Sequence, residues 1–267
     1  MPTITPLTVY CTTTMMIIAY LLGSIPSAVW IGKKYYGIDI REHGSKNAGT
    51  TNMLRVLGRR AAGPVFALDF LKGFLAVTLI QLLQYDDIVG SNDIINLKIA
   101  ALFAAVLGHI FPIFAGFRGG KGVATLVGAV TGIVPSIALL CFGVWLVVLM
   151  ATHYVSLSSI IAGCCFPVFT LLSPRHKSDV AAENIEQLLA KGDVAAKENI
   201  KQLLASSADK INLSLIVFSF VIALLLIVTH RKNIKRLLAG TESKIYIWHP
   251  RRVHRTPEPP RSDEAPK

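Results

Sequence analysis

Long apolar runs separated by short polar segments dominate the pattern of this chain. Several runs reach about 18 or more apolar residues, which is enough for a helix to cross a hydrocarbon layer of roughly 30 Å. The pattern predicts spans at about 7–31, 61–83, 95–115, 122–134, 136–152, 155–172 and 211–229. It therefore predicts an all-α, polytopic integral membrane protein with seven transmembrane helices.

Composition supports this class. Hydrophobic residues make up 52% of the 267 positions and charged residues 16%, against about 25% charged in soluble domains. No Lys or Arg precedes the first apolar run. The basic opening of a cleaved signal peptide is thus missing, and we expect this run to remain as a span. The four cysteines lie in or beside apolar runs without metal-ligand spacing, so we expect apolar fillers and no metal or cofactor.

Segment 122–152 allows two interpretations, one overlong helix or a hairpin of two short spans. A single straight helix of its length would run about 46 Å, and Pro135 near its middle would break or kink it. Basic residues favour the hairpin. The 32–60 loop holds seven Lys/Arg, the tail from His230 holds ten, and the 84–94 loop holds none. The hairpin places both basic segments on the cytoplasmic side, with the N-terminus outside and the C-terminus inside.

Two further segments differ from the membrane domain predicted at 1–172 and 211–244. Segment 173–210 repeats "VAAENIEQLLAKGD" as "VAAKENIKQLLA", with apolar positions at helical spacing. It predicts an inserted extracytoplasmic amphipathic helical hairpin, either a tolerated insertion or a surface that binds a partner or lies on the membrane. Segment 245–267 is basic and Pro-rich and predicts a disordered cytoplasmic tail.

Four polar islands interrupt the apolar pattern, and the predicted topology places all of them on the cytoplasmic face. They are 41–60, 108–125, 152–159 and 230–244. The second island holds "GFRGGKGVAT", with Gly119, Gly120 and Gly122 around Lys121. Glycines before a helix, together with a Lys, favour an anion such as phosphate. The alternative is a turn that merely packs tightly.

The first island combines hydrogen-bonding groups with fixed positive charge. Arg41 and Arg55 supply planar guanidinium groups that suit phosphate. The neutral groups come from Ser45, Asn47, Thr51 and Asn52. Their density beside arginine favours a polar, anionic small molecule, although the same residues also suit a flexible cytoplasmic loop.

Other polar residues near the span ends allow both structural and functional interpretations. His109 and His230 become candidates for proton transfer if both face one site. Asp69 and Lys72 lie three residues apart inside a span, which favours a structural ion pair. Ser156 and Ser158 in the third island either cap a helix or contact a ligand.

Together the islands indicate an enzyme or carrier that brings a phosphorylated, water-soluble molecule to the lipid. The formal net charge of +11 does not require nucleic acid, because basic residues gather on the cytoplasmic side of membrane proteins. A transporter or flippase for a phosphorylated solute is the alternative. Transporters, however, usually place polar groups at mid-bilayer within repeated halves, and no repeat occurs among the spans.

The motifs resemble the bacterial acyl-phosphate-dependent glycerol-3-phosphate acyltransferases. The resemblance lies in "GSIPSAVWIGKKYYGIDIREHGSKNAGTTNMLRVLG" with "LDFLKG", in "GHIFPIFAGFRGGKGVAT", in "YVSLSS" and in "HRKNIKRLLAGTESK", which occur in that order. It implies acyl transfer from a fatty acyl phosphate to the sn-1 hydroxyl of glycerol 3-phosphate at the cytoplasmic face of the inner membrane. The products are lysophosphatidic acid and phosphate.

The resemblance also implies roles for single residues. Ser45 and Arg55 form the essential pair of the first motif, and the glycines around Lys121 form the glycerol-phosphate loop. The last motif contributes His230, Asn233 and Glu242, of which Glu242 is expected to be structural. The H-x-x-x-x-D pair of other glycerol-phosphate acyltransferases is missing, which fits this family.

Two features depart from the family pattern, and one choice stays open. Lys46 stands where the family usually has a small residue, often Gly, and the 173–210 insertion has no counterpart. The proton of the attacking hydroxyl goes either to the donor's own phosphate or to a histidine. Donor choice, acyl phosphate or thioester, depends on the resemblance alone.

Overall fold

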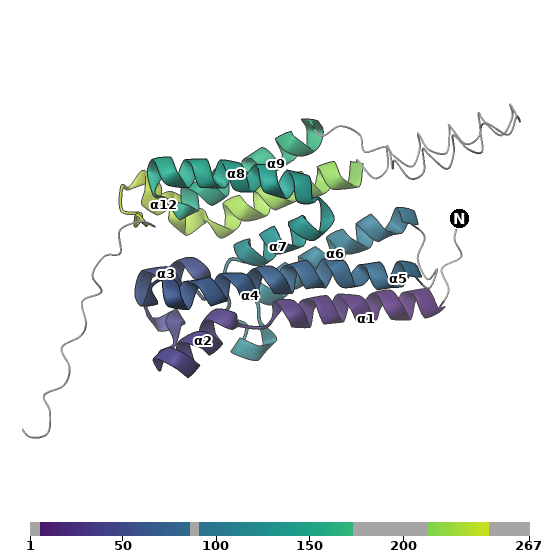
Figure 1. The fold of residues 1–267 in the computed structure, drawn as a ribbon, viewed down its shortest axis with the longest axis horizontal. Coiled ribbons are helices and arrows are strands. Elements are labelled where there is room, and N and C mark those ends of the chain that lie inside the picture. Colours follow the sequence, from purple (N-terminus) through teal and green to yellow (C-terminus); the bar gives the residue numbers. More distant parts are fainter. Residues whose placement is uncertain (1–5, 86–90, 173–212, 246–267) are drawn as a thin grey trace, which may run out of the picture.

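The computed structural model describes residues 6–85, 91–172 and 213–245, and their regular structure is helical throughout. The long helices run side by side as a bundle (Figure 1), which confirms the all-α class. The α-helices, long and short, are α1 Pro6–Gly23, α2 Ser27–Tyr36, α3 Thr50–Leu57, α4 Arg59–Thr78, α5 Leu82–Tyr85, α6 Ser91–Ile110, α7 Val123–Ile133, α8 Pro135–Thr152, α9 Val155–Leu172, the helix Leu213–Thr229 and α12 Arg231–Leu238. The predicted hairpin at 173–210 and almost all of the predicted tail lie outside the described residues.

Length and composition identify most of the predicted spans. Five helical segments are long and apolar enough to cross a membrane, or up to six if Leu213–Thr229 and α12 count as one segment bent by 60°. Helix α7 has 11 residues, which corresponds to about 16 Å at 1.5 Å per residue. The described part of the chain is therefore a polytopic membrane protein in which α7 is too short to span alone.

The predicted break within 122–152 is confirmed, since two helices replace one overlong helix. Helix α7 ends at Ile133, and α8 begins at Pro135. Proline favours the first position of a helix because its missing N–H has no partner there in any case. Pro135 therefore prevents α7 from continuing and provides the first residue of α8.

The predicted first span, 7–31, lies within a stretch long and apolar enough to cross a membrane, but this stretch is not one uninterrupted helix. Helix α1 ends at Gly23 and α2 begins at Ser27, so the candidate span Pro6–Tyr36 contains a break. Pro26 lacks an N–H group and cannot continue the helical hydrogen-bond pattern. The Ile25 carbonyl accepts from the Ser27 N–H at 3.0 Å and from the ammonium of Lys72 in α4 at 2.8 Å, so Lys72 ties this break to α4.

Close helix crossings hold α7 in the bundle. It packs mainly on α4, while α1 packs on α6 and α8 on α9. A Cβ atom added at Gly128 of α7 would lie 1.9 Å from the Phe70 carbonyl oxygen of α4. Small residues at a crossing let the backbones of membrane helices approach closely. This contact fixes the helix whose N-terminus follows the glycine loop.

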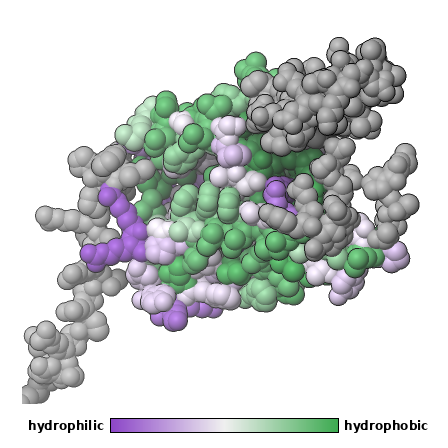
Figure 2. Space-filling model, turned by 45° about the vertical axis from the view of Figure 1, so that its right-hand side comes forward, coloured by the Kyte–Doolittle hydropathy of each residue, from purple (hydrophilic) through white to green (hydrophobic). Residues whose placement is uncertain are grey.

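Three of the short helices, α2, α3 and α12, lie at one end of the bundle, away from α5 (Figure 1). Hydrophobic residues cover the middle of the face in Figure 2, and a strongly hydrophilic cluster projects from one end. Helix α3 belongs to the first polar island and α12 to the last, so the fold brings these distant segments to the same end.

We expect Gly128→Ala to lower the free energy of unfolding by about 1–3 kcal/mol, because the added methyl group overpacks the α4–α7 crossing. Gly143 in α8 is the matched control, since nothing lies within 4 Å of a Cβ added there. Gly143→Ala should be neutral or stabilise by up to about 1 kcal/mol through helix propensity. Thermal unfolding in mild detergent measures both, and equal effects of the two variants would contradict the close crossing.

Candidate active site

Hydrogen bonds join three of the four polar islands at the end that carries α12. Lys121 Nζ in the glycine loop donates to Asn233 Oδ1 in α12. Asn233 Nδ2 donates to Glu242 Oε1 at 2.7 Å, and Ser156 Oγ in α9 donates to the same oxygen at 2.9 Å. The second, third and fourth islands therefore form one connected polar chain, which we call the Lys121–Glu242 chain.

Glu242 is the anchor of this chain. Its Oε2 atom accepts from Arg236 Nε at 2.6 Å. Although burial alone would raise the pKa of Glu242, hydrogen bonds from Arg236, Asn233 and Ser156 hold it below its ordinary value. Glu242 is thus a charged carboxylate held by three hydrogen-bond donors. The sequence did not predict Arg236 as the partner of Glu242, because six residues separate the two and no helical spacing links them.

Two partly buried cations at this end, Arg55 and Lys121, have no carboxylate partner in the described part of the chain. Within residues 6–85, 91–172 and 213–245, no acidic side chain lies within ion-pair distance of Arg55 or Lys121. Burial lowers the pKa of Arg55. The negative charge of Glu242 raises this pKa, and the positive charge of Arg236 lowers it further. Arg55 of the first island therefore lies in the same electrostatic environment as the other three islands.

The ammonium of Lys121 is strongly perturbed by this environment. Burial lowers its pKa to about 8, and the positive charges of Arg236 and Arg55 add to the effect while Glu242 opposes it. Arg236, Arg55 and Lys121 thus lie in the electrostatic range of one carboxylate, that of Glu242, and only Arg236 forms an ion pair with it. Such an arrangement favours binding of an anion, which would stabilise the charged forms of Lys121 and Arg55.

The backbone N–H groups of the first two glycines in the loop already have partners within the protein. The N–H of Gly119 donates to the Ile110 carbonyl at 3.1 Å and that of Gly120 to the His109 carbonyl at 3.2 Å. A Cβ atom at Gly120 would lie 2.3 Å from His109 Nε2, so only glycine permits this approach. The loop therefore offers an anion the Lys121 side chain and the N-terminus of α7, beginning after Gly122, rather than the first two glycine N–H groups.

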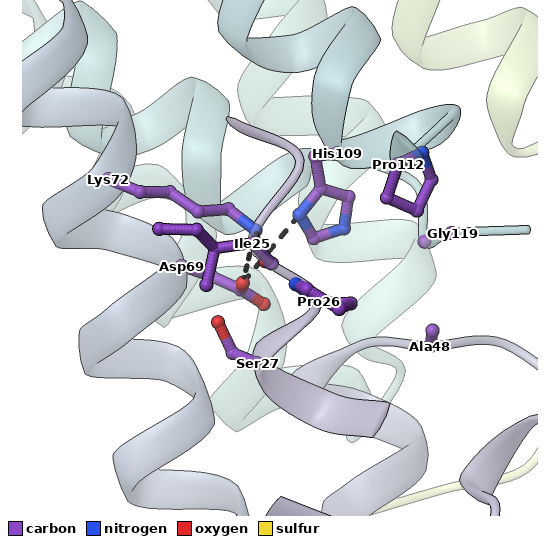
Figure 3. A pocket seen from close by; sticks show the side chains of 10 residues that line it. Ile25, Pro26, Ser27, Ala48, Asp69, Lys72, His109, Pro112 and Gly119 are labelled. Carbon is purple, nitrogen blue, oxygen red and sulfur yellow. Dashed lines mark hydrogen bonds and ion pairs between the residues drawn. The ribbon is translucent and has the colours of Figure 1, made fainter. Parts of the chain in front are cut away.

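His109 lies behind the glycine loop, beside a buried ion pair. Figure 3 shows Lys72, Asp69 and His109 converging near Ser27. Lys72 Nζ lies 2.8 Å from Asp69 Oδ1, so the predicted pair forms. His109 Nδ1 is 3.7 Å from the same oxygen and 3.1 Å from Thr125 Oγ1. The adjoining cavity measures about 10 Å³, about the room one water molecule needs.

His230 differs from His109 in its hydrogen bonding. It lies at the bend between Leu213–Thr229 and α12, and its Nδ1 is 2.9 Å from the Leu226 carbonyl oxygen. A carbonyl only accepts, so Nδ1 carries the hydrogen and Nε2 is left as an acceptor. His230 thus has the tautomer that a general base needs, whereas the hydroxyl beside His109 does not fix a tautomer. Each histidine thus has its own hydrogen-bond partners.

Asn52 organises the first island instead of facing outward. It is 2% exposed, and its Nδ2 lies 3.0 Å from the carbonyl oxygens of Ile40, His43 and Asn47. Its Oδ1 accepts from the Ser45 backbone N–H at 2.8 Å. All polar groups of this side chain thus hold the loop, which leaves the Ser45 side chain exposed at its tip.

The remaining candidates divide between the loop and α9. Thr51 lies in the first turn of α3, and Asn47 uses its backbone carbonyl to hold Asn52. Lys46 has φ +60°, a conformation that favours glycine, which agrees with the residue usual there in the family. Ser158 donates to the Tyr154 carbonyl at 2.9 Å, so of the two serines only Ser156 joins the Lys121–Glu242 chain.

The site contains cations, hydroxyl groups and imidazoles. Among the described residues, no group of three or more His, Cys, Asp or Glu side chains is arranged to hold a metal ion. The chemistry that these residues support is binding of phosphate groups together with transfer of a proton to or from a hydroxyl.

Comparison with known proteins agrees with this chemistry. Residues 13–240 match the protein family described as glycerol-3-phosphate acyltransferase. The glycerol-3-phosphate acyltransferase of Chlorobium phaeobacteroides (strain DSM 266) is 38% identical over 234 residues, covering 86% of this chain and 95% of the relative. That of Salinibacter ruber is 37% identical over 245 residues, covering 89% and 94%.

A solved structure is similar over nearly the same length. The crystal structure of PlsY (YgiH), an integral membrane glycerol 3-phosphate acyltransferase, in its glycerol 3-phosphate form has a TM-score of 0.64 and 35% identity. The match covers 88% of this chain and 96% of that one. The lysophosphatidic acid form has a TM-score of 0.63 and 33% identity. This chain belongs to the glycerol-3-phosphate acyltransferase family.

Proposed function

We propose that this protein transfers a fatty acyl group from an acyl phosphate to the sn-1 hydroxyl of glycerol 3-phosphate. The products are lysophosphatidic acid and inorganic phosphate. The observation that carries the proposal is a pair of partly buried cations, Arg55 and Lys121, that have no carboxylate partner among the described residues, with Lys121 just before the N-terminus of α7. Glycerol 3-phosphate and lysophosphatidic acid, the molecules in the two PlsY structures, both present a phosphate to such a site.

The proposed reaction requires positioning and charge stabilisation. The hydroxyl oxygen of glycerol 3-phosphate bonds to the acyl carbon, the bond from that carbon to the phosphate oxygen breaks, and phosphate leaves with the electron pair. An acyl phosphate is already activated, so no covalent enzyme intermediate is needed. Lys121, Arg55 and the N-terminus of α7 hold the phosphate groups, which brings the reactants together and stabilises developing negative charge.

The remaining candidates support this arrangement. Asn233 holds Lys121 through its Oδ1 while Glu242 fixes its Nδ2, so its proposed role is to aim the ammonium group. The exposed hydroxyl of Ser45, on the loop that Asn52 organises, orients the acceptor hydroxyl or the acyl carbonyl. The proton of the attacking hydroxyl goes to His230 Nε2 or to the phosphate of the donor.

We also propose seven membrane segments with the N-terminus outside, the C-terminus inside and the site on the cytoplasmic face of the inner membrane. Five long apolar segments, Leu213–Thr229 with α12, and the short helix α7, which enters the membrane packed against α4, would make up the seven. Exposed basic residues at the end carrying α2, α3 and α12 support the orientation. They include Lys33, Lys34, Arg59, Arg60, Arg231 and Lys232.

Reporter fusions test this topology. A cytoplasmically active reporter fused after residue 245 should be active, and one inserted after residue 88 should not. The prediction reverses for a reporter that works only outside the cytoplasm. Activity of the same reporter at both positions would contradict the odd number of spans between these points.

The activity is tested with protein purified in mild detergent and labelled glycerol 3-phosphate, offering palmitoyl phosphate, palmitoyl-CoA or palmitoyl carrier protein in parallel. We expect label in lysophosphatidic acid with palmitoyl phosphate alone. Arg55→Ala should lower kcat/KM roughly 30- to 4,000-fold, because removing a partner of a buried phosphate charge costs about 2–5 kcal/mol. Arg60→Ala, at an exposed position of α4, is the matched control.

Different failures of this assay have different meanings. Turnover with a thioester would retain the acyltransferase and reject the acyl-phosphate donor. The absence of product from folded protein would favour a transporter. His230→Gln in the same assay separates the proton acceptors: a loss in kcat of about 100-fold or more assigns the base to His230, and a change below tenfold assigns it to the phosphate of the donor.

The pKa of Lys121 predicts a pH dependence. Because burial lowers this pKa to about 8, the ammonium loses its charge as pH rises through that value, and kcat/KM for glycerol 3-phosphate should fall. The substrate phosphate has its second pKa at about 6 and does not titrate in this range. Lys121→Arg keeps its charge and should remove the fall near pH 8. An unchanged fall in Lys121→Arg would assign it to another group.

A further inference from the structure

Arg41 lies outside the Lys121–Glu242 chain but reaches the segment that leads into the glycine loop. It belongs to the short 3-10 helix Ile40–Glu42 in the first polar island. Its Nη1 atom donates to the Ala115 carbonyl at 2.7 Å and lies 3.3 Å from the Arg118 carbonyl oxygen. One guanidinium group thus crosses 74 residues of sequence to hold two carbonyls just before Gly119.

Asp39 fixes the direction of this guanidinium. Its Oδ1 accepts from Arg41 Nε at 2.9 Å, and its Oδ2 accepts from Arg41 Nη2 at 2.7 Å. Paired, charge-assisted bonds of this kind set the plane of the guanidinium as well as its position. The hydrogen bond from Arg41 holds the pKa of Asp39 well below its usual range. The carboxylate therefore stays charged and keeps Nη1 directed at the loop.

The segment that Arg41 holds has little packing of its own. Phe111, Ile113, Phe114 and Phe117 are each about half exposed, between 48% and 58%. Phe117 has φ +58°, which is uncommon for a residue other than glycine. A loop with exposed apolar side chains and an unfavourable backbone conformation depends on hydrogen bonds to keep its shape. The two carbonyls bound by Arg41 lie on either side of Phe117.

We propose that Arg41, directed by Asp39, is a positioning residue that fixes segment 115–118 and thereby places Lys121 for the phosphate of the substrate. Lys121 follows Arg118 by three residues, and Gly119 and Gly120 between them bond to α6. Arg41 and α6 therefore hold the loop at consecutive points. This inference depends on the proposed binding of glycerol 3-phosphate at Lys121.

The structure offers a matched control. Lys33 pairs with the same carboxylate, its Nζ lying 3.2 Å from Asp39 Oδ2, but its side chain is 57% exposed and its recorded polar contact is with Asp39. Arg41→Ala removes the contacts with the loop, Asp39→Asn weakens the group that directs Arg41, and Lys33→Ala removes only an exposed partner of Asp39. Arg41→Lys keeps the charge but cannot reproduce the fork that bonds Asp39 and the loop together.

The test compares steady-state kinetics and thermal unfolding of these variants in detergent with the wild-type enzyme. We expect Arg41→Ala to raise KM for glycerol 3-phosphate about tenfold or more, with kcat changed less than about threefold. Arg41→Lys and Asp39→Asn should show smaller rises in KM, and Lys33→Ala should match the wild type. A purely structural role would lower the unfolding temperature with KM unchanged, and that result would overturn the proposal.

A binding measurement separates failure of this inference from failure of the proposed function. A ligand that binds the folded state raises its unfolding temperature. Millimolar glycerol 3-phosphate should therefore stabilise the wild type and Lys33→Ala, but should stabilise Arg41→Lys and Asp39→Asn less. An inactive wild type that is still stabilised would reject the acyltransferase and leave this comparison intact. Equal stabilisation of all four proteins would reject the positioning role, even if Arg41→Ala failed to fold.

Discussion

The carboxylate of Glu242 is the negative charge on which the arrangement of the candidate site depends. It receives hydrogen bonds from Ser156 of α9, from Asn233 of α12 and from Arg236 near the end of the same helix. Without it, Arg236, Arg55 and Lys121 would repel one another in a partly buried environment where charge interactions are stronger than in water. The carboxylate thus joins the last two polar islands and holds Asn233 against Lys121.

One carboxylate does not balance three cations, and this difference explains the proposed selectivity of the site. Burial and neighbouring positive charge lower the pKa values of both Arg55 and Lys121, which means that the charged forms are disfavoured in the site as it stands. An entering phosphate reverses this cost, so anion binding and protonation of Lys121 are thermodynamically coupled. A neutral glycerol offers no such compensation. The same groups that destabilise the unliganded site therefore favour a phosphorylated acceptor.

The sequence predicted the parts of this structure that depend on local pattern. Apolar run length identified the long helices, and Pro135 marked a break because an internal proline opposes a continuous helix. The break at Pro26 was missed although it has the same cause, since the apolar run around it suggested one helix. Polar islands identified the site, but not which donors were already used. The backbone N–H groups of Gly119 and Gly120 and the amide of Asn52 have partners set by tertiary packing, which no spacing rule reveals.

The buried and partly buried charges can be separated by the partners they have. Three basic side chains each lie within 2.8 Å of a carboxylate oxygen: Lys72, Arg41 and Arg236. Each also joins segments around the site. Lys72 bonds to the break at Ile25, Arg41 bonds to the loop before Gly119, and Arg236 ties α12 to Glu242 beyond its end. Arg55 and Lys121 lack such a partner within the described residues. A cation that already has a carboxylate gains less from a phosphate than one that does not. In the proposed site, the acidic residues therefore decide which basic residues hold the backbone and which are left to bind the substrate.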